Sequence, residues 1–178
     1  WLEEEADAQH HDPLGSLHEA TLGVEPERLG DFTTPEQHIP ATGVAGVDWE
    51  VCMTLNTTWG YSEHDRAWKS DETLIRNLID IVSKGGNYLL NIGPKGDGSV
   101  PEESVASMHA IGAWMKANCE AIYATQASPF ENLDWGRCTQ KELGDGITRL
   151  YLHVFDWPEN GRLVLKGLAN TPVKAALL

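Results

Sequence analysis

Midway along the chain, the hydrophobic pattern switches twice from the strand type to the helix type. Residues 47–55 combine apolar and β-favouring side chains, which predicts a buried strand. Ser70 can cap a helix whose apolar residues recur at helical spacing until Gly85-Gly86 ends it. A second strand is predicted at 87–92, and Pro101 is expected as the first residue of another helix. Strand, helix, strand and helix with short connections predict a β/α unit with right-handed crossovers.

Three parts of this unit are predicted to bury apolar side chains. The strand at 87–92 is continuously apolar, which is typical of a parallel-sheet strand covered on both faces. Each helix is predicted to bury one stripe. The stripe of the first helix comprises Leu74, Ile75, Leu78, Ile79 and Val82. The stripe of the second comprises Val105, Met108, Ile111 and Met115.

The C-terminal part of the chain follows a different pattern. Residues 147–155 alternate between apolar and polar side chains, and 162–166 resemble a second strand after a turn at 157–161. We therefore expect an antiparallel hairpin formed by these two segments. The change of pattern predicts two domains, one over 1–125 and one over 135–178.

Charge and cysteine content narrow the classes of partner. With 13 Lys and Arg against 27 Asp and Glu, the net charge of −14 disfavours nucleic acid and anionic membranes and leaves neutral ligands open. Apolar runs stay well short of the roughly 18 residues that a membrane-spanning helix needs. Three cysteines without paired spacing indicate neither a disulfide framework nor a zinc site. We expect no metal and no cofactor.

Several separated motifs resemble one known family. They are the segment from Trp49 to Tyr61, Trp68-Lys69-Ser70, the segment from Gly85 to Pro94, Asp97-Gly98 and the segment from Glu120 to Tyr123. Together they resemble the retaining α-L-fucosidases of glycoside hydrolase family 29. The resemblance implies an α/β fold: the C-terminal portion of a (β/α)₈-like barrel, followed by the start of an antiparallel β-sandwich. In such barrels the active site lies at the C-terminal ends of the strands.

Retaining glycosidases need two carboxyl groups, one as nucleophile and one as acid/base. The resemblance makes Glu36, in Thr34-Pro35-Glu36, the candidate acid/base. The competing candidate is Glu50, inside the first predicted strand; a carboxylate there is more typical of a buried hydrogen-bond anchor. In this family the nucleophilic aspartate lies on an earlier strand, and we expect it upstream of Trp1.

Two further residues are candidates for substrate binding. Arg28 resembles an arginine that reaches the sugar in the family, and the five N–H donors of its guanidinium suit ring and hydroxyl oxygens. The alternative for Arg28 is a surface residue. Trp59 follows the first predicted strand, where an indole can bury the apolar patch around the C5 methyl group of fucose and donate its N–H elsewhere. The alternative for Trp59 is a core residue.

The resemblance therefore implies an α-L-fucosidase acting on fucosylated oligosaccharides or glycoconjugates, in a secreted, periplasmic or lysosomal setting. A homo-oligomer is left open. We interpret the chain as a piece of a longer protein and expect the piece alone to release no nitrophenol from an aryl fucoside. The alternatives are a non-catalytic fucose-binding protein derived from the same family, and an acidic scaffold whose aromatic residues only pack.

Overall fold

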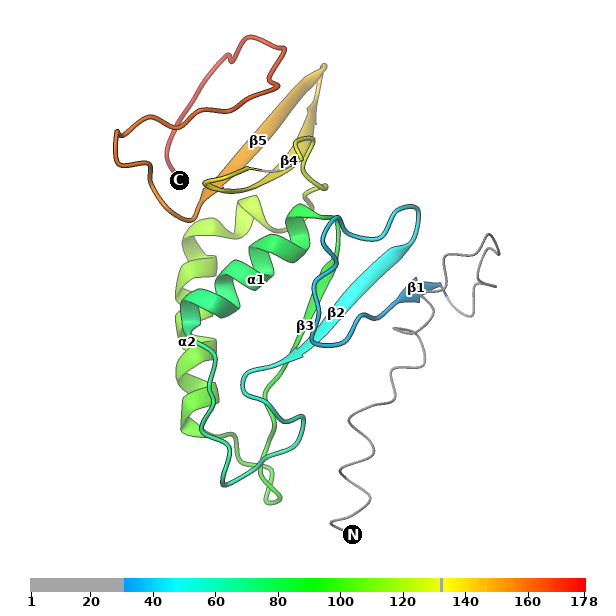
Figure 1. The fold of residues 1–178 in the computed structure, drawn as a ribbon, viewed down its shortest axis with the longest axis vertical. Coiled ribbons are helices and arrows are strands. Elements are labelled where there is room, and N and C mark those ends of the chain that lie inside the picture. Colours follow the sequence, from blue (N-terminus) through cyan, green and yellow to red (C-terminus); the bar gives the residue numbers. More distant parts are fainter. Residues whose placement is uncertain (1–30, 132) are drawn as a thin grey trace.

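The computed structural model describes residues 31–131 and 133–178, which form a helix-and-sheet part followed by a hairpin (Figure 1). The elements of the first part are β1 (Phe32–Thr33), β2 (Asp48–Thr54), α1 (Asp71–Ser83), β3 (Asn87–Asn91), α2 (Glu102–Asn118) and the short 3₁₀ helix η3 (Cys119–Ala121). The hairpin consists of β4 (Gly136–Gly144) and β5 (Ile147–Val154).

The first three strands form a parallel sheet in the order β1-β2-β3, which confirms the predicted β/α unit. Alternate residues of the central strand β2 point toward α1, so Trp49, Val51 and Met53 form a buried core with Ile81. Helix α1 also packs against β3 and α2, and both helices lie along one side of the sheet (Figure 1). The core therefore lies between β2 and α1.

Helix α1 begins and ends where its sequence predicts. The Ser70 hydroxyl accepts a hydrogen bond from Thr73 N (3.1 Å), as an N-cap does. After the helix, Gly85 adopts a φ of +81°, which only glycine takes without strain. Gly86 is required for a different reason, since a Cβ there would lie 2.5 Å from the Trp49 ring. The Gly85-Gly86 pair thus turns the chain and lets β3 approach the core.

Helix α2 differs from its predicted form in two ways. Pro101 is the N-cap, with ψ of 142°, rather than the first helical residue. The predicted buried stripe is wrong at Val105 and Met108, whose side chains are 42% and 43% exposed. The residue of α2 that is buried is Ser104, whose hydroxyl donates to Ile92 O (3.1 Å) just after β3. Ile111 and Met115 of the predicted stripe are half-buried, so the inward face of α2 combines Ser104 with the C-terminal part of the stripe.

The expectation that β3 is covered on both faces is also wrong. Leu89, in the middle of the strand, is 45% exposed. The neighbouring Tyr88 packs against the core beneath α1, whereas Leu89 points to the opposite face of the sheet, which neither helix of the described residues covers.

The hairpin forms between different segments from those predicted. Strand β5 pairs with β4 before it and not with 162–166, which forms no strand. The turn is Asp145-Gly146, with φ of 51° and 72°, as expected of a two-residue type I′ hairpin turn. The turn predicted at 157–161 does exist, with Gly161 N donating to Pro158 O (2.8 Å), but it joins no strands.

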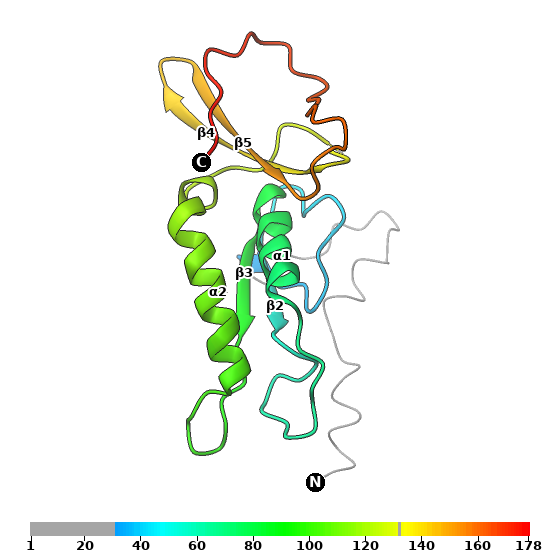
Figure 2. The same cartoon turned by 90° about the vertical axis from the view of Figure 1, so that its left-hand side faces the viewer.

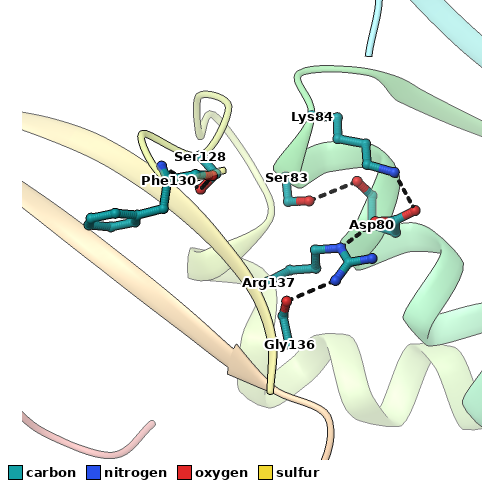
Figure 3. A network of polar contacts seen from close by, with 7 residues as sticks. All are labelled: Asp80, Ser83, Lys84, Ser128, Phe130, Gly136 and Arg137. Atoms are coloured by element: carbon teal, nitrogen blue, oxygen red, sulfur yellow. Dashed lines mark hydrogen bonds and ion pairs between the residues drawn. The ribbon is translucent and has the colours of Figure 1, made fainter. Parts of the chain in front are cut away.

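Charged side chains join the hairpin to the C-terminal end of α1 (Figure 3). Asp80 of α1 accepts a hydrogen bond from Lys84 Nζ (2.8 Å) and forms an ion pair with Arg137 of β4. Nearby, the Ser128 amide donates to Ser83 O (2.8 Å). Arg137 also lies over the ring of Phe155, 5.6 Å from its centroid, while the guanidinium of Arg76 from α1 lies 4.9 Å from the same centroid.

A buried histidine of β5 contacts the partner strand β4. His153 of β5 is 8% exposed, and its Nε2 lies 3.2 Å from the Thr139 hydroxyl of β4, which donates to Ala121 O (2.7 Å). Burial disfavours the charged imidazolium and lowers the pKa of His153 to about 4.

This shift predicts an acid-sensitive hairpin. The unfolded chain, with an ordinary histidine pKa near 6.5, binds this proton before the folded chain does, so stability present above pH 6.5 is lost as the pH falls toward 4. From pH 7 to pH 5 the free energy of unfolding should fall by about 2 kcal/mol through this group. We expect His153→Gln to remove that part of the pH slope measured by urea denaturation. The same change at exposed His109 of α2 is the control; an unchanged slope in His153→Gln would contradict the assignment.

Candidate functional site

The loops that follow β2 and β3 lie at the same end of the sheet, opposite the hairpin (Figures 1 and 2). Parallel strands end at a common edge, so residues 55–69 and 92–101 are brought together although β2 and β3 are separated by α1. This edge is the one at which α/β sheets usually carry their ligands.

Glu36 and Trp59, two of the predicted site residues, meet at this edge. Glu36 forms a parallel β-bridge with Cys52 of β2, and the following amide, Gln37 N, donates to Cys52 O (2.9 Å). Trp59 Nε1 donates a hydrogen bond of 2.6 Å to Glu36 Oε1. Both side chains are exposed, Trp59 to 40%, so the alternative of a core tryptophan does not describe this position.

The backbone at Trp59 is held by the neighbouring strand. Asn91, the last residue of β3, donates from Nδ2 to Trp59 O (2.6 Å). Gly93 follows with φ of +53°, and a Cβ there would lie 3.3 Å from the same carbonyl oxygen. The end of β3 therefore supports the loop that carries the indole.

A carboxylate organises the rest of this loop. Asp65 accepts hydrogen bonds from the Thr57 hydroxyl (2.7 Å), the Thr57 amide (2.9 Å) and the Ala67 amide (2.9 Å). The hydrogen bond from the Thr57 hydroxyl is the largest cause that lowers the pKa of Asp65, followed by those from the Ala67 and Thr57 amides. The ionised Asp65 side chain thus holds the loop closed through hydrogen bonds with the backbone amides of other loop residues.

Lys69, at the end of the same loop, contacts the C-terminal end of β2. Its Nζ donates to Thr54 O (2.6 Å) and Asn56 O (2.8 Å), and its amide donates to Leu55 O (2.8 Å). Partial burial lowers the pKa of Lys69, while the charge of Asp65 acts in the opposite direction. Both ends of the loop are therefore anchored at the same strand terminus.

Of the remaining candidates, Arg28 lies outside the described residues. Glu50 is half-buried in β2 opposite Asn87, about 7 Å before Cys52 along the strand and farther from the edge. Trp49 belongs to the core, and Trp68 is half-buried.

Glu36 and Trp59 lie on an open surface. A cavity of about 200 Å³ lies beside the loop and is lined by Tyr61, Asp65, Trp68 and Lys95 among others, without Glu36 or Trp59. Within residues 31–131 and 133–178, His, Cys, Asp and Glu form no group of three that could hold a metal ion. No helix in that part is long and apolar enough to span a membrane.

The sequence reasoning did not identify Gln37, Thr54 and Lys69 as parts of this site. Gln37 directly follows the candidate acid Glu36, and Thr54 and Lys69 lie within the quoted motifs, but none of the three was assigned a role. Thr54 and Lys69 are 15 residues apart, and nothing in their spacing indicates contact. The end of β2 is predicted to within one residue, but which side chains meet there is shown only by the structure.

The arrangement combines a carboxyl group with an adjacent indole on an open face. One carboxyl oxygen accepts the indole N–H, and a carboxyl group has a second oxygen that can carry or accept a proton. The indole offers an apolar surface next to that oxygen. This combination suits proton transfer to a ligand with both hydroxyl groups and an apolar patch, as in a deoxy sugar.

Comparisons of the chain with known proteins all match one family. A family model described as "Alpha-L-fucosidase" matches residues 6–120. The alpha-L-fucosidase of Dictyostelium discoideum is 30% identical over 155 residues, covering 85% of this chain and 33% of the relative. The human tissue alpha-L-fucosidase is 36% identical over 131 residues, covering 69% of this chain and 27% of the relative. The chain thus spans a third or less of the length of these relatives.

Solved structures agree. Alpha-L-fucosidase isoenzyme 1 from Paenibacillus thiaminolyticus matches with a TM-score of 0.62 and 44% identity, covering 63% of this chain and 28% of that one. A GH29 alpha-L-fucosidase from Bacteroides thetaiotaomicron matches with a TM-score of 0.67 and 33% identity, covering 78% of this chain and 33% of that one. That structure is described as a covalent intermediate trapped with 2-fluoro-fucosyl fluoride in a Glu-to-Gln variant.

Proposed function

This chain belongs to the α-L-fucosidase family, and we propose that the complete protein containing it hydrolyses terminal α-L-fucosyl linkages with retention of configuration. The substrate is a fucosylated oligosaccharide or glycoconjugate. The observation that carries the proposal is the hydrogen bond of 2.6 Å between Trp59 Nε1 and Glu36 Oε1 at the C-terminal ends of parallel strands.

Glu36 is the acid/base in this proposal. In the first step its carboxyl group protonates the departing glycosidic oxygen while an aspartate attacks the anomeric carbon. In the second step the Glu36 carboxylate takes a proton from water, which releases fucose from the covalent intermediate. The aspartate is supplied by a segment outside this chain. The covalent intermediate described for the Bacteroides relative supports this two-step course.

Trp59 binds the apolar side of the sugar. Its indole ring faces the C5 methyl group, and its N–H orients the Glu36 carboxyl group, so one side chain serves both binding and proton transfer. Arg28 donates to ring and hydroxyl oxygens. Within the (β/α)₈-like barrel that we propose for residues 1–125, these groups share the C-terminal face. Residues 135–178 begin a β-sandwich.

The two roles of Trp59 can be separated by substitution in the full-length protein. We expect Trp59→Phe to keep the apolar contact and lose the hydrogen bond to Glu36, which lowers kcat about tenfold with a smaller change in KM. Trp59→Ala should also lose the ring and raise KM for an α-L-fucoside about tenfold further. Steady-state kinetics check both; equal effects of the two substitutions on KM would contradict a contact with the sugar.

The stereochemistry of the first product tests the proposed activity. The full-length protein is mixed with an aryl α-L-fucoside, and the anomeric proton signals are followed by NMR before mutarotation. Release of α-L-fucose first supports a retaining fucosidase. Release of β-L-fucose first would overturn retention, and binding without release would identify a fucose-binding protein instead.

A further inference from the structure

The loops that carry Glu36 and Trp59 meet at one buried hydroxyl group. Thr54, the last residue of β2, is fully buried. Its Oγ1 accepts a hydrogen bond from Gln37 Nε2 (2.8 Å) and donates one to Asn56 O (2.6 Å). Gln37 directly follows Glu36, and Asn56 begins the turn that leads to Trp59. The hydroxyl therefore connects the two sides of the Glu36–Trp59 pair.

On the Glu36 side, the connection runs through an unusual backbone conformation. Gln37 has a φ of +53°, in the left-handed region that residues other than glycine seldom adopt. Such a conformation persists where the surroundings hold it. Its amide donates to Cys52 O (2.9 Å), and its side chain reaches Thr54, so the side chain extends the contact with β2 after the backbone has turned away. These contacts fix the position of Glu36 beside β2.

On the Trp59 side, the connection includes a lysine. Lys69 Nζ donates to both carbonyl oxygens next to the hydroxyl, Thr54 O and Asn56 O, and lies 3.4 Å from Thr54 Oγ1. The Asn56 carbonyl thus receives a hydrogen bond from Thr54 and one from Lys69. This fixes the first residue of the turn from which the Trp59 indole reaches back to Glu36.

We propose that the Thr54 hydroxyl is a positioning group that holds the Glu36 carboxyl against the Trp59 indole. The proposal rests on the function proposed above, in which Glu36 is the acid/base. Thr54 itself touches neither the substrate nor the reacting atoms. Thr54→Val keeps the shape of the side chain but leaves Gln37 Nε2 without this acceptor and the Asn56 carbonyl without one donor.

The kinetic test compares two substrates that differ in their need for a proton. A dinitrophenyl fucoside has a leaving group that departs without protonation, whereas a fucosyl disaccharide requires the acid. In the full-length protein, Thr54→Val should lower kcat/KM for the disaccharide about tenfold more than for the aryl fucoside, because small displacements of an acid/base are costly. Thr54→Ser, which keeps the hydroxyl, should restore the wild-type ratio.

A second substitution keeps the test valid if Thr54→Val fails to fold. Gln37→Asn retains a residue type that tolerates positive φ but shortens the side chain, so that it cannot reach Thr54. Because Gln37 is exposed, this variant should fold. We expect the same bias against the disaccharide. Equal loss on both substrates in the folded variants, or no rescue by Thr54→Ser, would overturn the proposal.

A readout independent of activity separates this proposal from the proposed function. With ¹⁵N-labelled tryptophan, the Trp59 indole resonance, assigned through Trp59→Phe, should move in Glu36→Ala, which removes the acceptor of its hydrogen bond. Thr54→Val and Gln37→Asn should both move the resonance in the same direction, and Thr54→Ser should leave it at the wild-type position. An inactive wild type with this dependence on Thr54 would overturn the fucosidase function alone. A resonance unchanged in both Thr54→Val and Gln37→Asn overturns the positioning role whatever the activity.

Discussion

Glu36→Gln in the full-length protein is expected to lower kcat/KM for an unactivated fucosyl disaccharide by about 10³-fold. The amide keeps the size of the side chain and can still accept the Trp59 N–H bond, but its own N–H groups are too weakly acidic to protonate the leaving oxygen. General acid catalysis contributes about 10²–10⁴-fold, which sets the size of the loss. Steady-state kinetics with the disaccharide measure it.

The control for this prediction is Glu50, the competing candidate for the acid/base. Glu50→Gln changes a half-buried glutamate of β2, farther from the edge that holds Trp59, and should alter kcat/KM less than threefold if its role is structural. The loss in Glu36→Gln should also be much smaller for a dinitrophenyl fucoside, whose leaving group needs no proton. A large loss in Glu50→Gln with little effect in Glu36→Gln would reverse the assignment.

Gly136→Ala is expected to have the largest effect on stability. A Cβ at Gly136 would lie 1.9 Å from His153 O and 3.1 Å from Phe155 N, both backbone atoms of the partner side of the hairpin. Backbone atoms paired in a ladder cannot move aside as a flexible side chain can, so we expect a cost of about 3 kcal/mol or more. Amide hydrogen exchange of β5 in the full-length protein should accelerate about 100-fold or more.

A second glycine provides the matched control. Gly112 lies in α2, and a Cβ there would meet nothing within 4 Å. Alanine in the interior of a helix is favoured over glycine by about 1 kcal/mol, so Gly112→Ala should leave β5 exchange unchanged and slightly stabilise the protein. Exchange of β5 in Gly136→Ala at the wild-type rate would show that the hairpin does not pack at this glycine.

The ends of α1 and the position of β2 could be predicted from the sequence because they depend on neighbouring residues. The Ser70 cap and the Gly85-Gly86 stop need only local geometry, and alternate burial along β2 follows from its apolar pattern. The hairpin was assigned to the wrong pair of segments because Trp157 to Gly161 contains a strong turn signal. The Asp145-Gly146 turn, directly before the alternating strand, carries a stronger one.

The sequence did not indicate which side chains are buried by elements distant along the chain. Val105 and Met108 of the α2 stripe are exposed although Ile111 and Met115 are half-buried, and Ser104 is buried instead, which apolar periodicity does not predict. In the candidate site, Glu36 and Trp59 were identified from their motifs, but the contact between them depends on Thr54. That buried hydroxyl joins segments 17 residues apart, and no spacing rule predicts such a contact.

Rescue by azide tests the assignment of Glu36 most directly. Glu36→Ala in the full-length protein should leave the covalent fucosyl intermediate stranded after an activated aryl α-L-fucoside reacts, because no group activates water. Azide needs no base, and it attacks from the face that the leaving group vacated. We expect azide to restore turnover and to yield α-L-fucosyl azide. Formation of β-L-fucosyl azide, or no response to azide in a folded variant that has lost its activity, would contradict Glu36 as the acid/base.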